Sequence, residues 1–189
     1  MKRFAILRPG DPSVTRQDID SWAILNTVAL LYNELEKHTA EWPDIRAVSW
    51  VRSYWAPGTS WSMCLYTGPD LANVGRYNEF CSMPFLAINE VVETACVDAE
   101  LRLANLSQTI PGLITVVASG EDLPDGAAAW GEFAPQWVRS YVGTSQNEVV
   151  AAFVADGLDF DALKAQTDKN GWTLHRVVEI RPDEYLAES

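Results

Sequence analysis

The sequence predicts an α+β protein made of two copies of a β-α-β-β-α-β unit, the split βαβ or ferredoxin-like arrangement. The pentapeptide Trp-Val-Arg-Ser-Tyr occurs at residues 50–54 and again at 137–141, which indicates an internal duplication. Further along the chain, segments 68–74 and 88–91 match segments 157–163 and 177–180. Two similar units in one chain are therefore expected.

The first copy starts with an apolar strand at 4–7, which ends at Arg8 and is followed by a turn. Thr15 with Asp18 fits a capping box for a helix that continues to about residue 37. Two strands joined as a hairpin follow, then a helix and a fourth strand. The strands are expected at 46–54, 60–67 and 86–92, and the helix is capped by Asp70 and faces the sheet with Leu71, Val74 and Phe80.

The second copy has the same order, except that the glycine-rich stretch before Trp137 is too short for a long helix, so its first helix is predicted to be truncated. Its strands are expected at 113–118, 136–142, 148–155 and 172–180, with a helix at 159–168. The expected domains are 1–94 and 112–189, joined by a linker at 95–111 that has helical spacing.

A ferredoxin-like sheet carries its helices on one face and needs a partner for the other face. The two sheets are therefore predicted to cover each other around a pseudo-two-fold axis, as in a dimeric α+β barrel. Strand alternation places Trp50, Arg52 and Tyr54 on one face. It does the same for Trp137, Arg139 and Tyr141. Both sets are expected to point into the space between the sheets, and the reverse assignment of faces stays open.

Composition excludes several classes of partner. Lys and Arg number 14 against 26 Asp and Glu, a net charge of −12, so nucleic acid and anionic lipid should be repelled. No apolar segment has the roughly 20 residues that a membrane span needs, and the run at 4–7 is too short for a signal peptide. Cys64, Cys81 and Cys96 form no disulfide or zinc pattern. A cytoplasmic protein with reduced thiols is expected.

Two strings resemble a family of small nickel-binding-like proteins of ferredoxin-like fold, formerly a domain of unknown function. One runs through 48–54, 64–70 and 83–85, and the other is clearest at 137–141 and 171–181. The resemblance implies the fold, a tendency to form homo-oligomers, and divalent-metal binding in relatives. In the family pattern His stands where this chain has Arg52 and Arg139, and guanidinium has no lone pair for a metal. His38 and His175 lie in different copies, so no metal site and no cofactor are expected.

The arginines carry the functional prediction, because an Arg flanked by aromatic rings can hold a carboxylate or phenolate. The alternative is a structural ion pair with a neighbouring acid such as Glu90 or Glu179. The leading hypothesis is a protein that binds a small aromatic or anionic ligand between the two repeats. Two alternatives stay open: a cofactor-independent isomerase, cyclase or monooxygenase, and a nickel-binding protein. Enzymatic activity is therefore undecided. The candidate ligand-binding residues are Trp50, Arg52, Tyr54, Trp137, Arg139, Tyr141 and His175.

Overall fold

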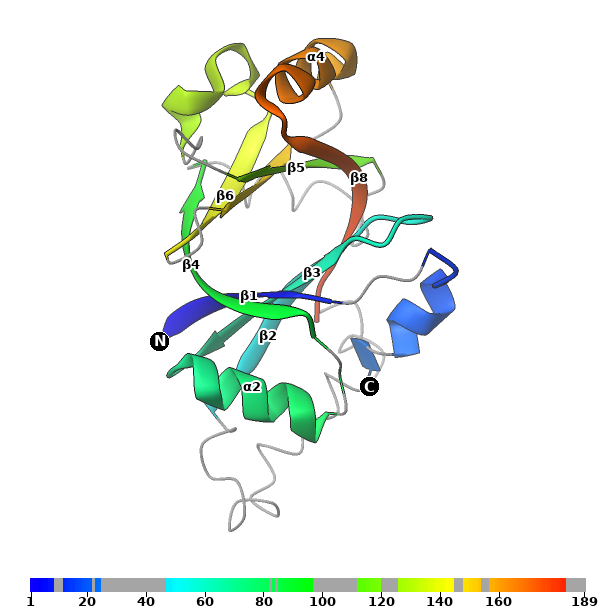
Figure 1. Cartoon of the computed structure of the whole chain (residues 1–189), viewed down its shortest axis with the longest axis vertical. Coiled ribbons are helices and arrows are strands. Elements are labelled where there is room, and N and C mark those ends of the chain that lie inside the picture. The colour runs from blue at the N-terminus through cyan, green and yellow to red at the C-terminus, as the bar shows by residue number, and fades with distance from the viewer. Residues whose placement is uncertain are drawn as a thin grey trace. The chain divides into compact units, whose positions relative to one another are not determined.

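The computed structural model describes residues 1–8, 12–21, 23–24, 47–81, 83, 85–96, 112–119, 126–144, 148–153 and 157–182. These residues contain strands and helices in mixed order (Figure 1). The strands are β1 (Lys2–Leu7), β2 (Ser49–Trp55), β3 (Ser62–Gly68), β4 (Ala87–Ala95), β5 (Leu113–Ser119), β6 (Trp137–Gly143), β7 (Glu148–Phe153) and β8 (Thr173–Ile180). The helices are α2 (Leu71–Phe80), the 3₁₀ helix η2 (Ala127–Phe133) and α4 (Phe160–Asn170).

The strand order corrects the predicted architecture. The eight strands form one closed antiparallel barrel in the order β1-β3-β2-β8-β5-β7-β6-β4, whereas the sequence predicted two ferredoxin-like repeats in a dimeric α+β barrel. In this order β4 lies next to β6 and β1, and β8 lies next to β2 and β5. A closed sheet has no exposed edge strand. The ferredoxin-like tandem-repeat description is therefore wrong.

The chain divides into two compact units. The first comprises Met1–Glu90 and Glu179–Ser189, and the second comprises Val91–Val178. Most of the predicted linker, from 97 to 111, lies outside the described residues.

Helix α2 packs on one face of the β1-β3-β2 sheet in the first unit. Its N-cap Asp70 accepts a hydrogen bond from the backbone N–H of Asn73. Val74 is buried close to Gly68, where an added Cβ would lie 2.8 Å from Val74 Cγ2, so only glycine lets the helix approach this closely. Tyr77 packs edge-to-face on Tyr66, with ring centroids 5.7 Å apart.

The prediction for the buried face of α2 is wrong at its two ends. Leu71 is 50% exposed and Phe80 is 41% exposed. The buried positions are Asn73, Val74, Tyr77 and Asn78. This set follows the four-residue spacing that defines one face of a helix, and two of its members are amides that the apolar pattern does not select.

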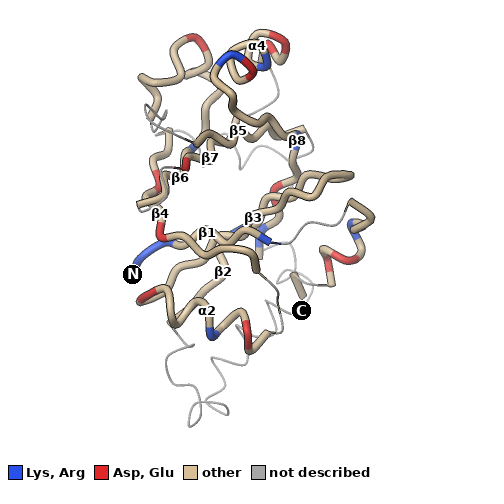
Figure 2. The backbone as a smooth tube through the Cα atoms, in the orientation of Figure 1, with Lys and Arg blue, Asp and Glu red and all other residues tan. Residues whose placement is uncertain are grey.

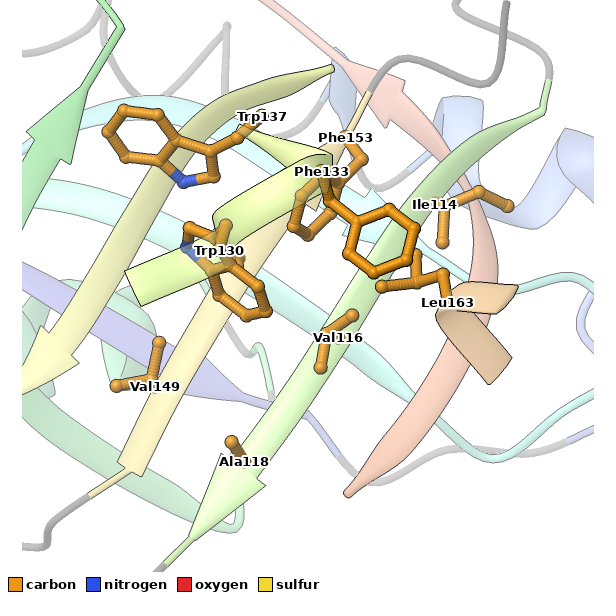
Figure 3. Close-up of a cluster of buried hydrophobic side chains, with 10 residues drawn as sticks. Ile114, Val116, Ala118, Trp130, Phe133, Trp137, Val149, Phe153 and Leu163 are labelled. Atoms are coloured by element: carbon orange, nitrogen blue, oxygen red, sulfur yellow. The ribbon is translucent and has the colours of Figure 1, made fainter. Parts of the chain in front are cut away.

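The second unit has an apolar core between its sheet and α4 (Figure 3). Leu163 from α4 and Trp130 from η2 meet the sheet there, and Trp130 packs edge-to-face on Phe153 at 4.8 Å. The other buried members are Ile114, Val116, Ala118, Phe133, Trp137, Val149 and Ala151. Helix α4 is capped by Asp159, which accepts from Ala162 N, and ends at Gly171 with φ 72°.

Charged groups lie mainly on exposed surfaces. Acidic and basic residues alternate along α4 (Figure 2), where Lys164 Nζ lies 2.6 Å from Asp168 Oδ2. Among the residues that the structure describes, no helix is both long enough and apolar enough to cross a membrane.

Candidate functional site

Both pentapeptides contain a β-bulge that the sequence did not predict. In β2, Trp50 lies opposite Tyr66 but Arg52 lies opposite Leu65, so Val51 has no opposite residue. In β6, the register shifts in the same way between Trp137 and Arg139. A bulge adds one residue to a strand and interrupts the alternation of its side chains.

The bulges separate each tryptophan from the arginine two residues later. Residues directly opposite each other on paired strands share a sheet face, so Trp50 lies on the face of Tyr66, the face that α2 covers. Trp50 Nε1 donates to Ser53 Oγ on that face at 3.0 Å. The predicted grouping of Trp50 with Arg52 and Tyr54 does not occur.

The second pentapeptide has the same arrangement. Trp137 lies opposite Phe153 in the core beneath α4, and its Nε1 donates to Ser140 Oγ at 2.8 Å. Arg139 and Tyr141 lie on the other face, opposite Ala152 and Val150. The two indoles are therefore core residues that cover the bulges.

Arg52 belongs to an ion pair in the first unit. Its Nη1 lies 3.6 Å from Glu179 Oε1, and the two side chains are 12% and 1% exposed. This is the structural alternative that the sequence left open for Arg52. Glu90, the other acid considered, pairs with Lys2 at 2.8 Å. Tyr54 is buried on the same face as Arg52, opposite Met63.

Arg139 lies in a row of directly opposite residues that crosses the second unit. From β8 to β6 the row contains His175, Thr115, Ala152 and Arg139. Arg139 and Thr115 are both 0% exposed. Burial lowers the pKa of His175, because desolvation disfavours the imidazolium. In the second unit, the structure thus brings the predicted residues Arg139, Tyr141 and His175 to one face.

A buried polar cluster around Arg8 was missed at the sequence level. Arg8 is 7% exposed, and its Nη2 donates to Asn78 Oδ1 at 2.6 Å and to Tyr66 Oη at 3.0 Å. Its Nε donates to Cys64 Sγ at 3.4 Å. The signal was the spacing of Phe4, Ile6 and Arg8, which places them on one strand face.

No metal site is formed by the described part of the chain, where no group of three or more His, Cys, Asp or Glu side chains could hold an ion. His38 lies outside the described residues. The arginines at 52 and 139 offer no lone pair. Nickel binding thus has no ligand set to support it in the described ranges.

No protein-family model matches the chain, and no curated protein matches it. Among solved structures, the chain is similar to a protein from Lactobacillus acidophilus NCFM that carries a provisional monooxygenase assignment. The two are 7% identical over 95% of this chain and 94% of that chain, with a TM-score of 0.39. A likeness this weak carries no argument, so the candidate site rests on its own geometry.

Proposed function

We propose that the chain binds a small organic anion, a carboxylate or a phenolate, on the sheet face of the Val91–Val178 unit that lies opposite α4. The observation that carries the proposal is the row His175, Thr115, Ala152 and Arg139, which places a buried cation, a buried hydroxyl and an imidazole on neighbouring strands.

Arg139 supplies the charge that selects an anion. Its guanidinium stays protonated in proteins and offers a planar set of donors that matches a carboxylate. Hydrogen bonds of this kind are stronger in a buried setting than in water. The adjacent Ala152 is the smallest side chain of the row and lies between Arg139 and Thr115.

The Thr115 hydroxyl supports a polar ligand. Its Oγ1 is buried and has no hydrogen-bond partner among the described residues. Leaving such a group unsatisfied costs about 1–3 kcal/mol, and a ligand oxygen or hydroxyl would remove that cost. His175, whose pKa is lowered by burial, is neutral near pH 7 and adds no repulsion to Arg139.

The dimensions suit a ligand with one aromatic ring. The row covers three strand spacings, about 14 Å between the backbones of β8 and β6. Tyr141 lies in the next row, opposite Val150 and Glu93, and gives an apolar ring with a hydroxyl beside the proposed position.

Calorimetric titration with benzoate, 4-hydroxybenzoate and neutral benzamide tests the proposal. The two anions should bind, and benzamide should bind at least tenfold more weakly, since it lacks the charge that Arg139 selects. Arg139→Lys keeps the charge but loses the bidentate geometry, so it should weaken benzoate binding. Equal affinity for benzamide and benzoate would exclude the proposed role of Arg139.

Thr115→Val separates ligand binding from folding. Because the hydroxyl is unsatisfied, the variant should have a melting temperature at or above that of the parent, yet bind 4-hydroxybenzoate about 2–10-fold more weakly. Thr173→Val is the matched control, because Thr173 lies on the same face at the exposed end of β8. If Thr115→Val and Thr173→Val have the same affinity, Thr115 is not part of the site.

A further inference from the structure

A carboxylate lies on the same sheet face as Arg139, towards the other end of β7. Val149 and Phe153 of this strand pack in the core beneath α4 (Figure 3). The pairing of β7 with β5 keeps a regular register over the whole of β7. Side chains alternate between the two faces of a strand, so Glu148 and Ala152 point away from α4, as Arg139 does.

Glu148 makes no hydrogen bond or ion pair with the residues that the structure describes. Its side chain is half-buried, and burial is what raises the pKa of its carboxyl. Glu93, which lies opposite Tyr141 on the same face, already interacts with another group. Of these two acids, Glu148 is therefore the one that a ligand can pair with.

A charge at this position costs stability. A half-buried carboxylate loses part of its hydration, and Glu148 gains no described partner in return. Groups that cost stability in this way are typical of sites where a ligand supplies the missing partner. Thr115 Oγ1, on the same face, is also buried without a hydrogen-bond partner among the described residues. Two polar groups on this face thus lack a partner within the described chain.

Strand geometry separates Glu148 from the Arg139 row. Glu148 lies four residues from Ala152, the residue opposite Arg139, and four residues of strand cover about 14 Å. No cation of the described chain contributes to the pKa of Glu148. Arg139 and Glu148 therefore do not neutralise each other, and each can hold the opposite charge of one ligand.

The residues between the two charged positions are apolar. Val150 lies opposite Val117 on β5 and opposite Tyr141 on β6. Val150 is 5% exposed and Tyr141 is 1% exposed. An aromatic ring gains free energy on such a surface, because its contact with water is lost and it can pack against the phenol.

The face becomes more open towards Glu148. Along β5, Thr115 is buried, Val117 is half-buried and Ser119 is exposed. Ser119 lies directly opposite Glu148. A cationic group bound at Glu148 would keep part of its hydration, which reduces the free energy lost when a charge leaves water.

We propose that the ligand of this face is an aromatic acid with a protonated amino group at its far end, its carboxylate bound by Arg139 and its ammonium by Glu148. This inference rests on the proposed anion site and extends that site along β7. The ammonium donates charge-assisted hydrogen bonds to the Glu148 carboxylate. Recognition of both ends selects against ligands that carry only the negative charge.

Calorimetric titration of the full chain with 4-(aminomethyl)benzoate and 4-methylbenzoate tests the inference. The two compounds share the ring and the carboxylate and differ in the ammonium group. 4-(Aminomethyl)benzoate should bind at least about tenfold more tightly, because it adds a hydrogen bond between charged groups. Equal affinities would overturn the inference and leave the anion site standing, whereas a lack of binding by both compounds would overturn both.

Two glutamine variants separate Glu148 from the net charge of the chain. Glu148→Gln should bind the two compounds with equal affinity. Glu132→Gln removes the same charge from an exposed position on η2, and it should keep the preference for 4-(aminomethyl)benzoate. A preference that persists in Glu148→Gln, or that is lost equally in Glu132→Gln, would show that Glu148 does not bind the ammonium. The melting temperature of Glu148→Gln, expected at or above that of the parent, shows that the variant is folded.

Discussion

The Arg52–Glu179 ion pair allows a quantitative test of how much a buried charge pair contributes in the first unit. Arg52 Nη1 and Glu179 Oε1 are 3.6 Å apart, and at an effective dielectric constant of about 20 their attraction is about 4–5 kcal/mol. Glu179 is 1% exposed, so Arg52→Met leaves a carboxylate buried without this cation. We expect a loss of about 3–5 kcal/mol in the free energy of unfolding.

That loss should be measurable by thermal and urea unfolding. For a chain of this size each kcal/mol shifts the melting temperature by about 2–4 °C, so Arg52→Met should melt about 6–20 °C below the parent. The double variant Arg52→Met, Glu179→Met removes both charges and should recover most of the loss, because an apolar pair can replace a buried ion pair at little cost. Both side chains make further interactions, so the double-mutant cycle is needed to isolate their mutual term.

Lys2 and Glu90 form the matched control. Their nitrogen and oxygen lie 2.8 Å apart, closer than in the buried pair, but their side chains are 54% and 35% exposed. Solvent screening reduces such a pair to about 0–1 kcal/mol, so Lys2→Met should change the melting temperature by a few degrees at most. If Arg52→Met is no more destabilising than Lys2→Met, or if the cycle gives no coupling, burial does not strengthen the Arg52–Glu179 interaction as argued.

Three further predictions concern stability. Gly171→Ala should lower the free energy of unfolding by more than about 1 kcal/mol in urea titrations, because the φ of Gly171 is 72°. Gly75→Ala inside α2 should instead raise it by about 0.5–1 kcal/mol, since the added Cβ would meet Ile88 Cδ1 at an ordinary 3.8 Å. Equal effects of the two substitutions would contradict this reasoning. Trp130→Ala should lower the free energy of unfolding by about 3–5 kcal/mol. Trp130→Phe should lower it clearly less, since the buried Nε1 has no hydrogen-bond partner in the described part of the chain. Equal losses of stability in the two variants would show that this N–H is bonded. Burial raises the pKa of Glu148, so the folded state binds its proton more tightly and loses stability as pH rises through the folded pKa. Glu148→Gln should therefore raise the melting temperature at pH 7 but not in acid. A gain in melting temperature that persists in acid would have another cause.

Local patterns predicted the elements well. Asp70 caps α2 as expected, and Thr15 and Asp18 form the expected reciprocal hydrogen bonds. The observed strands lie within a few residues of the expected ones. These features depend on side chains close in sequence, so a single sequence carries the information.

The pairing of the strands could not be predicted in the same way. Closure of the sheet depends on contacts between distant strands, and period-two patterning does not state which edge meets which. The bulges at Val51 and Val138 were also invisible, because valine is an ordinary strand residue and no glycine marks the insertion. The predicted site consequently included Trp50 and Trp137, which lie on the opposite face from Arg52 and Arg139.

The bulge also explains why one pentapeptide serves two different settings. In both strands it places the Trp and Ser on the helix-covered face and the Arg and Tyr on the other, and the indole donates to the serine hydroxyl. The chemistry then depends on the opposite strand, because Ser53 meets Cys64 whereas Ser140 meets Ala151. The pentapeptide therefore provides the same local backbone in both units, and the residues on the opposite strand decide what its side chains meet.

A change of function is expected to arise from residues on the strands that face the pentapeptides. Cys64 accepts hydrogen bonds from Arg8 and from Ser53, yet neither Arg8 nor Cys64 belongs to the pentapeptide. Thr115 and His175 share a row with Arg139 but lie on strands that carry no pentapeptide. Changing Thr115 or His175 should alter binding while the fold is retained, since the bulges and the Trp–Ser bonds stay in place. Substitution of the tryptophans should instead lower stability in both units, because each indole packs in a buried core position.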